Sequence, residues 1–247
     1  MIPIAAPKIL PLPAEDARVR EPLFNLREAA LYLDIPSSTF IRWARPTLNG
    51  SQSDKTSRQA LVYVLEHAGN EPRVPFVGLA EGYVLRAFRE AGVPLQRIRP
   101  ALARLEHEIG VPYALASGRL YTDGCEILFD YAEAESPELL RALTVVRSGQ
   151  NVFAAVVEQY LRRITFDAQQ WPTVISLPAY KDANVVVDVH RAFGRPLVMS
   201  GFGARVDDIV DRWEAGESIQ AVAKDFGLSI DECDDIIRVA YQHRKAA

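Results

Sequence analysis

The spacing of apolar positions in residues 24–45 predicts two short helices joined by a tight turn. The first helix has a small apolar face, made by Ala29, Ala30 and Leu33. Asn25, with Glu28 three residues later, has the spacing of a capping box. Pro36 ends this helix, because proline disfavours helical geometry in the residue before it. We expect Ser37 to cap the second helix, whose apolar face is made by Phe40, Trp43 and Ala44. The two helices predict a helix-turn-helix.

The pattern changes after residue 60, where two β-prone runs follow one another. Residues 61–65 and 73–77 flank a turn and predict a hairpin, which after a helix-turn-helix is a wing. Two further helices are expected at about 79–91 and 95–109, and Pro100 is expected to kink the second or to make it restart. The front of the chain therefore predicts a winged helix-turn-helix.

The remainder of the chain mixes short strands with helices. Strands are predicted at 119–122, 127–130, 143–147, 174–177 and 185–189, and a helix at 152–163. A glycine-bounded strand and turn at 194–203 precedes three short helices, at about 205–215, 218–226 and 229–243. Ser218 and Ser229 are good N-caps, and Gly216 and Gly227 are good helix ends.

The expected fold class is therefore α+β, mainly α, in four parts. An extended arm (1–22) contains five prolines. It is followed by the winged helix-turn-helix domain (23–115), a small α/β middle segment (116–180), and a C-terminal three-helix domain resembling a helix-turn-helix (181–247).

Composition adds little beyond a soluble globular class. Apolar residues make up 49% and charged residues 24% of the 247 residues. Cys125 and Cys233 are far apart and lack metal-site spacing, so neither a zinc site nor a disulfide framework is predicted. The sequence contains no signal-peptide pattern and no apolar run of about 20 residues. We therefore expect a cytoplasmic protein without a membrane partner.

Charge is distributed unevenly. The chain has a net charge of −4, but residues 1–115 are net +2 and residues 116–247 are net −6. Residues 203–247 alone are net −4. DNA contact is therefore expected from the front of the chain and not from the C-terminal helices.

A search for catalytic chemistry finds no matching constellation. The four histidines lack metal-ligand spacing, and no nucleophile elbow, phosphate loop or dinucleotide fingerprint is present. Acids gather at Asp207, Asp208, Asp211 and Glu214, and at Asp231, Glu232, Asp234 and Asp235. Solvated first helical turns explain most of them, and an acidic docking surface is the functional alternative. We expect no enzyme, no metal and no cofactor.

The second helix of the helix-turn-helix offers the best candidate site. Ser37, Ser38 and Thr39 begin it with hydroxyl groups that can contact phosphates and base edges. Arg42 lies one turn further on, and Arg45 follows it at i+3. The alternative is a helical hairpin of the core with exposed arginines. A homodimer is expected, because operator DNA is usually read as paired half-sites.

Two stretches resemble known families. Residues 26–43 resemble the winged helix-turn-helix start of MerR-like regulators, and residues 92–98 resemble the later helix of the same group. Residues 194–241, from Gly194-Arg195-Pro196 to Ala240-Tyr241, resemble domain of unknown function 433. Together they resemble the longer VapB-type antitoxins. The resemblance implies a chain that binds and inhibits a VapC-type toxin, a PIN-domain ribonuclease, and represses its own operon.

The same resemblance implies candidate toxin contacts. PIN ribonucleases hold Mg²⁺ with clustered acids, and an inhibitor can block such a site with an inserted cation. Arg244 and Lys245 near the C-terminus are the candidates here, together with Arg195. The alternative for Arg244 and Lys245 is a frayed, solvated terminus. The alternative function is a stand-alone MerR-like transcriptional regulator.

Overall fold

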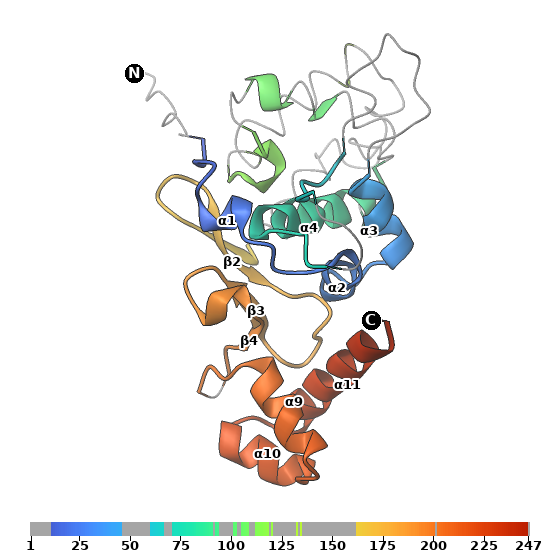
Figure 1. The fold of residues 1–247 in the computed structure, drawn as a ribbon, viewed down its shortest axis with the longest axis vertical. Coiled ribbons are helices and arrows are strands. Elements are labelled where there is room, and N and C mark those ends of the chain that lie inside the picture. Colours follow the sequence, from blue (N-terminus) through green and yellow to red (C-terminus); the bar gives the residue numbers. More distant parts are fainter. Residues whose placement is uncertain are drawn as a thin grey trace, which may run out of the picture.

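The computed structural model (Figure 1) has an α+β fold, mainly helical, as predicted. The structure describes residues 11–45, 60–66, 71–90, 92–93, 101–102, 105–108, 112–118, 120, 132, 134, 162–200 and 202–246. Its front elements are α1 (Ala17–Arg20), α2 (Leu26–Tyr32), α3 (Ser37–Trp43), α4 (Phe76–Glu90) and the short 3₁₀ helix η2 (Ala114–Ala116).

The long helix α4 is the centre of the front part, and nearly all of its side chains are buried. The α2–α3 pair packs on it at Gly82, where a Cβ atom would lie 2.7 Å from the Phe40 ring and 2.8 Å from Leu33. One turn earlier, a Cβ atom on Gly78 would lie 2.1 Å from the carbonyl oxygen of Tyr63. Two glycines on one face of α4 therefore allow two neighbouring segments to approach its backbone.

The predicted hairpin of the wing is not formed as two strands. The backbone N–H of Leu65 donates to the carbonyl of Arg73 at 2.8 Å, but neither 61–65 nor 73–77 is a strand. Val74 pairs instead with Phe24 in an isolated bridge, which uses its backbone groups. Phe76 already begins α4, three residues before the predicted start, because its buried side chain belongs to the apolar face of that helix.

An antiparallel sheet of four strands follows in chain order. Its strands are β1 (Ile164–Phe166), β2 (Pro172–Ser176), β3 (Val185–Asp188) and β4 (Leu197–Val198), with the 3₁₀ turn η4 (Ala192–Gly194) between the last two. The strands predicted at 174–177 and 185–189 are confirmed as β2 and β3. The pattern missed β1, because three residues are too few to show a period of two.

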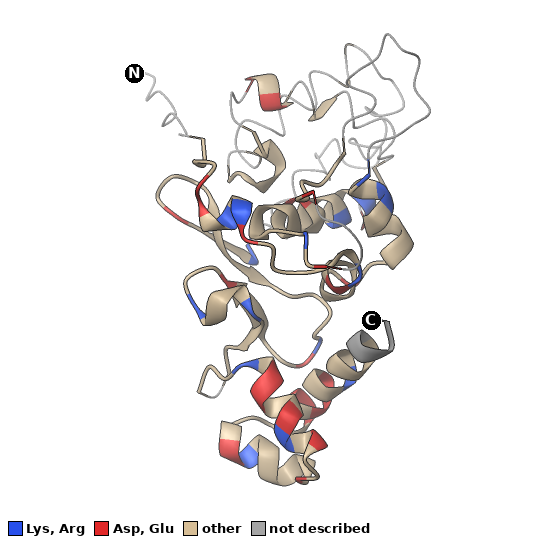
Figure 2. Ribbon diagram, viewed as in Figure 1, with Lys and Arg blue, Asp and Glu red and all other residues tan. Residues whose placement is uncertain are grey.

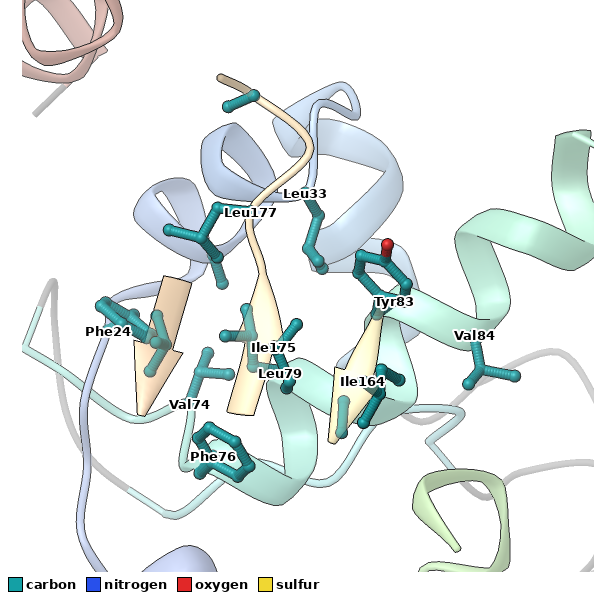
Figure 3. Packing of buried hydrophobic residues seen from close by; sticks show 14 of the residues in the cluster. Phe24, Leu33, Val74, Phe76, Leu79, Tyr83, Val84, Ile164, Ile175 and Leu177 are labelled. Carbon is teal, nitrogen blue, oxygen red and sulfur yellow. The ribbon is translucent and has the colours of Figure 1, made fainter. Parts of the chain in front are cut away.

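The sheet and the front helices share one hydrophobic core. Figure 3 shows Ile175 and Leu177 lying among Phe24, Val74 and Leu79. An ion pair also joins the two parts, because the Arg18 guanidinium contacts Asp167 beside the sheet at 2.6 Å. The predicted arm therefore includes a segment that is anchored to the sheet.

Three helices complete the chain: α9 (Val206–Glu214), α10 (Ile219–Phe226) and α11 (Ile230–Ala246). They confirm the three predicted helices and their caps. The Ser218 hydroxyl accepts from the N–H of Ala221 at 3.3 Å, and the Ser229 hydroxyl accepts from the N–H of Glu232 at 3.1 Å. Gly227 ends α10 in the left-handed region, with φ of 68°.

The helix predicted at 95–109 is helical at residues 101–102 and 105–108. The strands predicted at 119–122, 127–130 and 143–147 and the helix at 152–163 lie almost entirely outside the described residues. Within the described part of the chain, no helix combines the length and apolarity that a membrane span requires.

Candidate nucleic-acid interface

The first helix of the helix-turn-helix begins with the predicted capping box. The Asn25 side chain accepts from the N–H groups of Arg27 and Glu28, both at 2.9 Å. The Glu28 carboxylate accepts in return from the N–H of Asn25 at 2.6 Å. Three donors at the start of α2 are therefore satisfied, which fixes where the helix begins.

The turn between α2 and α3 is held from two distant parts of the chain. Asp34 has a left-handed φ of 52°, and the next N–H, of Ile35, donates to the carbonyl of Ala30 at 3.0 Å. Arg86 of α4 donates to the Leu33 carbonyl at 2.9 Å and contacts the Asp34 carboxylate at 3.4 Å. Lys181, which follows β2, reaches the same carboxylate at 2.7 Å. We call Asp34, Arg86 and Lys181 the turn clamp.

The start of α3 differs from the prediction by one residue. Pro36 is the N-cap and Ser37 is the first helical residue, so Ser37 makes no capping hydrogen bond from its side chain. The tight turn at Asp34 brings the chain into helical geometry early. At the other end, the carbonyl of Trp43 accepts from the N–H of Leu61 at 2.8 Å. Residues 60–66 therefore support the C-terminal end of α3.

The predicted DNA-contact residues divide into exposed and buried side chains. Ser38, Arg42 and Arg45 are exposed, and Ser37 is half-buried. Thr39 is only 7% exposed and lies on the side of Phe40 and Trp43, which are buried. The outer face of α3, defined here as Ser38, Arg42 and Arg45, is therefore the part that can reach a ligand.

The charge distribution agrees with this choice. Figure 2 shows basic positions on α3, and acidic positions on α9 and at other places in the C-terminal helices. No salt bridge joins Arg42 or Arg45 to another residue of the described chain. Their charge therefore remains available for the phosphate backbone of DNA.

A carboxyl group is buried beneath this helix pair. The side chain of Glu81 in α4 is 5% exposed, and it accepts from the N–H of Tyr63 at 2.6 Å. Burial raises the pKa of Glu81 to about 8, although the hydrogen bond from Tyr63 opposes this rise. The group is therefore largely protonated at neutral pH in the folded protein.

The acidic cluster of the C-terminal helices has two kinds of member. Asp207, Asp208, Asp231 and Glu232 occupy first helical turns, as predicted. Asp235 is different, because it is 2% exposed and accepts from the N–H groups of Lys181, Asp182 and Ala183 at 2.7–3.1 Å. Burial alone would raise the pKa of Asp235, but these donors and Arg238 outweigh burial and lower it. Asp235 therefore anchors α11 to the segment after β2.

The candidate toxin contacts lie elsewhere. Arg195 is exposed and directly follows η4. The backbone of Arg244 and Lys245 belongs to the last turn of α11, which continues past the predicted end at 243. No group of three or more His, Cys, Asp or Glu side chains in the described chain is arranged to hold a metal ion.

Two features of these surfaces were missed by sequence reasoning. The turn clamp joins residues up to 147 positions apart, so no local pattern could predict it. Phe193 is 98% exposed, although an aromatic residue in a sequence is ordinarily expected in the core. The only local signal was the Gly194 that follows it.

Comparison with known proteins relates this chain to a family model, to a curated protein and to a solved structure. The family model described as "Putative DNA-binding HTH domain" matches residues 22–102. A Mycobacterium tuberculosis (strain ATCC 25618 / H37Rv) protein named "Putative antitoxin VapB45" is 44% identical over 233 residues, which cover 90% of this chain and 95% of that protein. The crystal structure of Rv2018 from Mycobacterium tuberculosis is 43% identical, covers 87% of this chain and 97% of that chain, and has a TM-score of 0.71.

Proposed function

This chain belongs to the VapB45 family of antitoxins, and we propose that it neutralises a PIN-domain ribonuclease of the VapC type and represses its own operon. The observation that carries the proposal is the 44% identity to the antitoxin relative along 90% of the chain. The match of residues 22–102 to a DNA-binding model supports the second half of it. We assign the chain no catalytic role.

DNA binding is assigned to the outer face of α3. Ser38 and Arg42 lie one helical turn apart and Arg45 follows, so one surface carries a hydroxyl group and two guanidinium groups. Ser37 lies in the first turn beside them, whereas Thr39 is buried. Arginine fits phosphate oxygens and guanine edges, which gives both affinity and a means of reading sequence. We expect a homodimer on two half-sites of the operator.

Toxin neutralisation is assigned to cationic side chains that enter the acidic site of the ribonuclease. Arg195 is exposed, and Arg244 and Lys245 end the last helix, so each is a candidate. Deletion of residues 244–247 tests the C-terminal pair, because an unchanged inhibition of the toxin would leave Arg195 as the remaining candidate.

The direct test uses the purified product of the neighbouring reading frame. We expect it to co-purify with this chain, and its ribonuclease activity to be lost in the complex. A gel shift on the chain's own promoter, with and without that partner, tests repression. A shifted promoter with no bound partner would favour the alternative, a stand-alone MerR-like regulator. If the partner does not bind and the promoter is not shifted, the proposed function is wrong.

A further inference from the structure

A second exposed surface lies on the connection between β3 and β4 and on the residues that follow β4, far from α3. We define the β3–β4 surface by its side chains Arg191, Phe193, Arg195, Met199 and Phe202. Phe193 is 98% exposed, Phe202 80% and Met199 43%. A soluble protein gains free energy by burying such side chains, so their exposure within ten residues requires an explanation.

The backbone beneath Phe193 is strained. Ala192 and Phe193 both adopt left-handed conformations, with φ of 48° and 52°, and Gly194 continues them at 72°. L-residues avoid this region, because the Cβ atom comes too close to the following carbonyl oxygen. Since the Phe193 ring is almost fully exposed, packing of this ring within the chain does not offset the strain. Strain of this kind is concentrated at functional sites.

Packing fixes the turn that presents Phe193. A Cβ atom on Gly194 would lie 2.8 Å from Leu23, so the turn is packed closely against the front part. A cavity of about 360 Å³ lies beside it, lined by apolar side chains such as Leu23, Phe76 and Phe193 and also by Glu21 and Arg195. A cavity of about 150 Å³ can hold a benzene ring, so this partly polar one has room for a partner's side chain. The surface therefore combines the exposed ring of Phe193 with the cavity beside it.

Arg191 joins the two halves of the surface. Its guanidinium lies 3.8 Å from the Met199 sulfur, and a Cβ atom on Gly203 would lie 2.8 Å from the same group. The turn at Phe193 and the loop that carries Phe202 are therefore parts of one patch. Aromatic residues, methionine and arginine are the types enriched in protein–protein interfaces.

The charge of the patch identifies the kind of partner. Residues 191–205 contain three arginines and no acidic residue, in a chain of net charge −4. Arg205 pairs with Asp207 at 3.0 Å, whereas no salt bridge to a described residue is formed by Arg191 or Arg195. A second copy would place like charges opposite one another across a two-fold axis, which is unfavourable. An acidic surface on a different protein is the complementary partner.

We propose that the β3–β4 surface docks the protein that this chain neutralises, through an apolar pocket rimmed by carboxylates on that partner. The inference rests on the proposed antitoxin function and adds the surface to it. In Figure 1, α3 lies at the upper right of the described chain and the β3–β4 connection at the left. The two surfaces are separate, so DNA and the partner can be bound at the same time.

The test measures the affinity of the full-length chain for the purified product of the neighbouring reading frame. Phe193→Ser and Arg191→Glu are each expected to weaken binding at least tenfold and to reduce inhibition of the ribonuclease accordingly. Neither side chain is buried, so the circular dichroism spectrum and Tm should show a folded protein. The matched controls are Ile230→Ser, another exposed apolar side chain, and Lys224→Glu, another exposed cation, and both should bind as the wild type does.

The outcomes separate this inference from the proposed function. If the wild type binds its partner and the Phe193 and Arg191 variants bind equally well, the docking surface is wrong and the antitoxin function stands. If the wild type does not bind, both fail. If Phe193→Ser instead converts a dimer to a monomer in light scattering, the surface belongs to a second copy and the inference is overturned.

Discussion

The outer face of α3 and the β3–β4 surface both present arginines to solvent. They differ in whether the neighbouring apolar side chains are buried within the chain. The α3 helix buries its aromatic side chains, Phe40 and Trp43, leaves Ile41 half-buried, and has only polar side chains fully exposed. The β3–β4 surface exposes Phe193 on a turn of left-handed residues and Phe202 on the loop after β4. The large apolar side chains of α3 are therefore packed within the chain, whereas those of the β3–β4 surface remain exposed to solvent.

This difference matches two kinds of partner. A phosphate backbone requires charge and hydrogen-bond donors held in a fixed position, which a packed helix provides. A protein partner also supplies apolar area, so exposed aromatic side chains favour binding of the second kind. The contrast therefore supports our two proposals, that α3 contacts DNA and that the β3–β4 surface contacts a protein.

The largest effect that we predict is a pH dependence of the free energy of unfolding, caused by the buried carboxyl group of Glu81 in α4, the helix on which α3 packs. The folded pKa is raised to about 8 from an ordinary value of 4.5. Between these values the folded protein keeps a proton that the unfolded chain has lost, so the free energy of unfolding falls as pH rises. The contribution is fully present below pH 4.5, and about 3–5 kcal/mol is lost by pH 8.

Urea unfolding at pH 5 and pH 8 measures this effect. Glu81→Gln keeps an acceptor for the N–H of Tyr63 but cannot ionise, so its advantage over the wild type should grow with pH. Parallel pH profiles for the two proteins would show that Glu81 does not control this window. The same pH change should leave the conformation of the distant β3–β4 surface unaffected, provided that the protein remains folded.

The packing of α3 against α4 can be tested by a substitution at Gly82. A leucine there would place its Cβ atom 2.7 Å from the Phe40 ring, so the helix pair must move away from α4. Overpacking of this kind costs about 1–3 kcal/mol of the free energy of unfolding. DNA affinity should fall with it, because α3 is displaced, whereas partner binding should be retained. Loss of partner binding in a folded Gly82→Leu protein would contradict the separation of the two surfaces.

Removing a single cation from α3 should have a smaller and more specific effect. Arg42→Ala is expected to reduce the magnitude of the slope of log affinity against log salt by about 0.9, since one phosphate contact is lost. Gel shifts between 50 and 200 mM salt measure this slope. Lys224→Ala removes an exposed cation from α10 instead and should leave the slope unchanged. Equal effects of the two substitutions on the slope would contradict the proposal that α3 contacts DNA.

The sequence was most informative where a structure is decided locally. The capping box of Asn25 and Glu28, the Ser218 cap and the Gly227 end all formed as predicted, because each depends on residues within one turn. The exposed positions of Ser38 and Arg42 followed from the helical period in the same way. Thr39, one position further along the chain, is buried instead.

The sequence-based predictions failed where contacts between residues far apart in sequence determine the structure. Phe76 fits either a strand or a helix by its neighbours in sequence, and only its burial in the α4 face selects the helix. The turn clamp joins Asp34 to Lys181 across 147 positions. Phe193 was missed for a similar reason, since the turn that carries it packs through Gly194 against Leu23, which is distant in sequence.

The strained turn offers the finest test of the comparison, because there stability and binding should change in opposite directions. Asparagine tolerates the left-handed region better than other side chains with a Cβ atom. Phe193→Asn should therefore raise the free energy of unfolding by about 0.5–1 kcal/mol while weakening partner binding. Ala192→Asn relaxes the neighbouring residue but keeps the ring, so it should stabilise the fold similarly and leave binding intact. Thermal unfolding and affinity measured on both variants decide the matter. A Phe193→Asn protein that is less stable than the wild type would show that the ring serves the fold itself, and the contrast with α3 would then lose its basis.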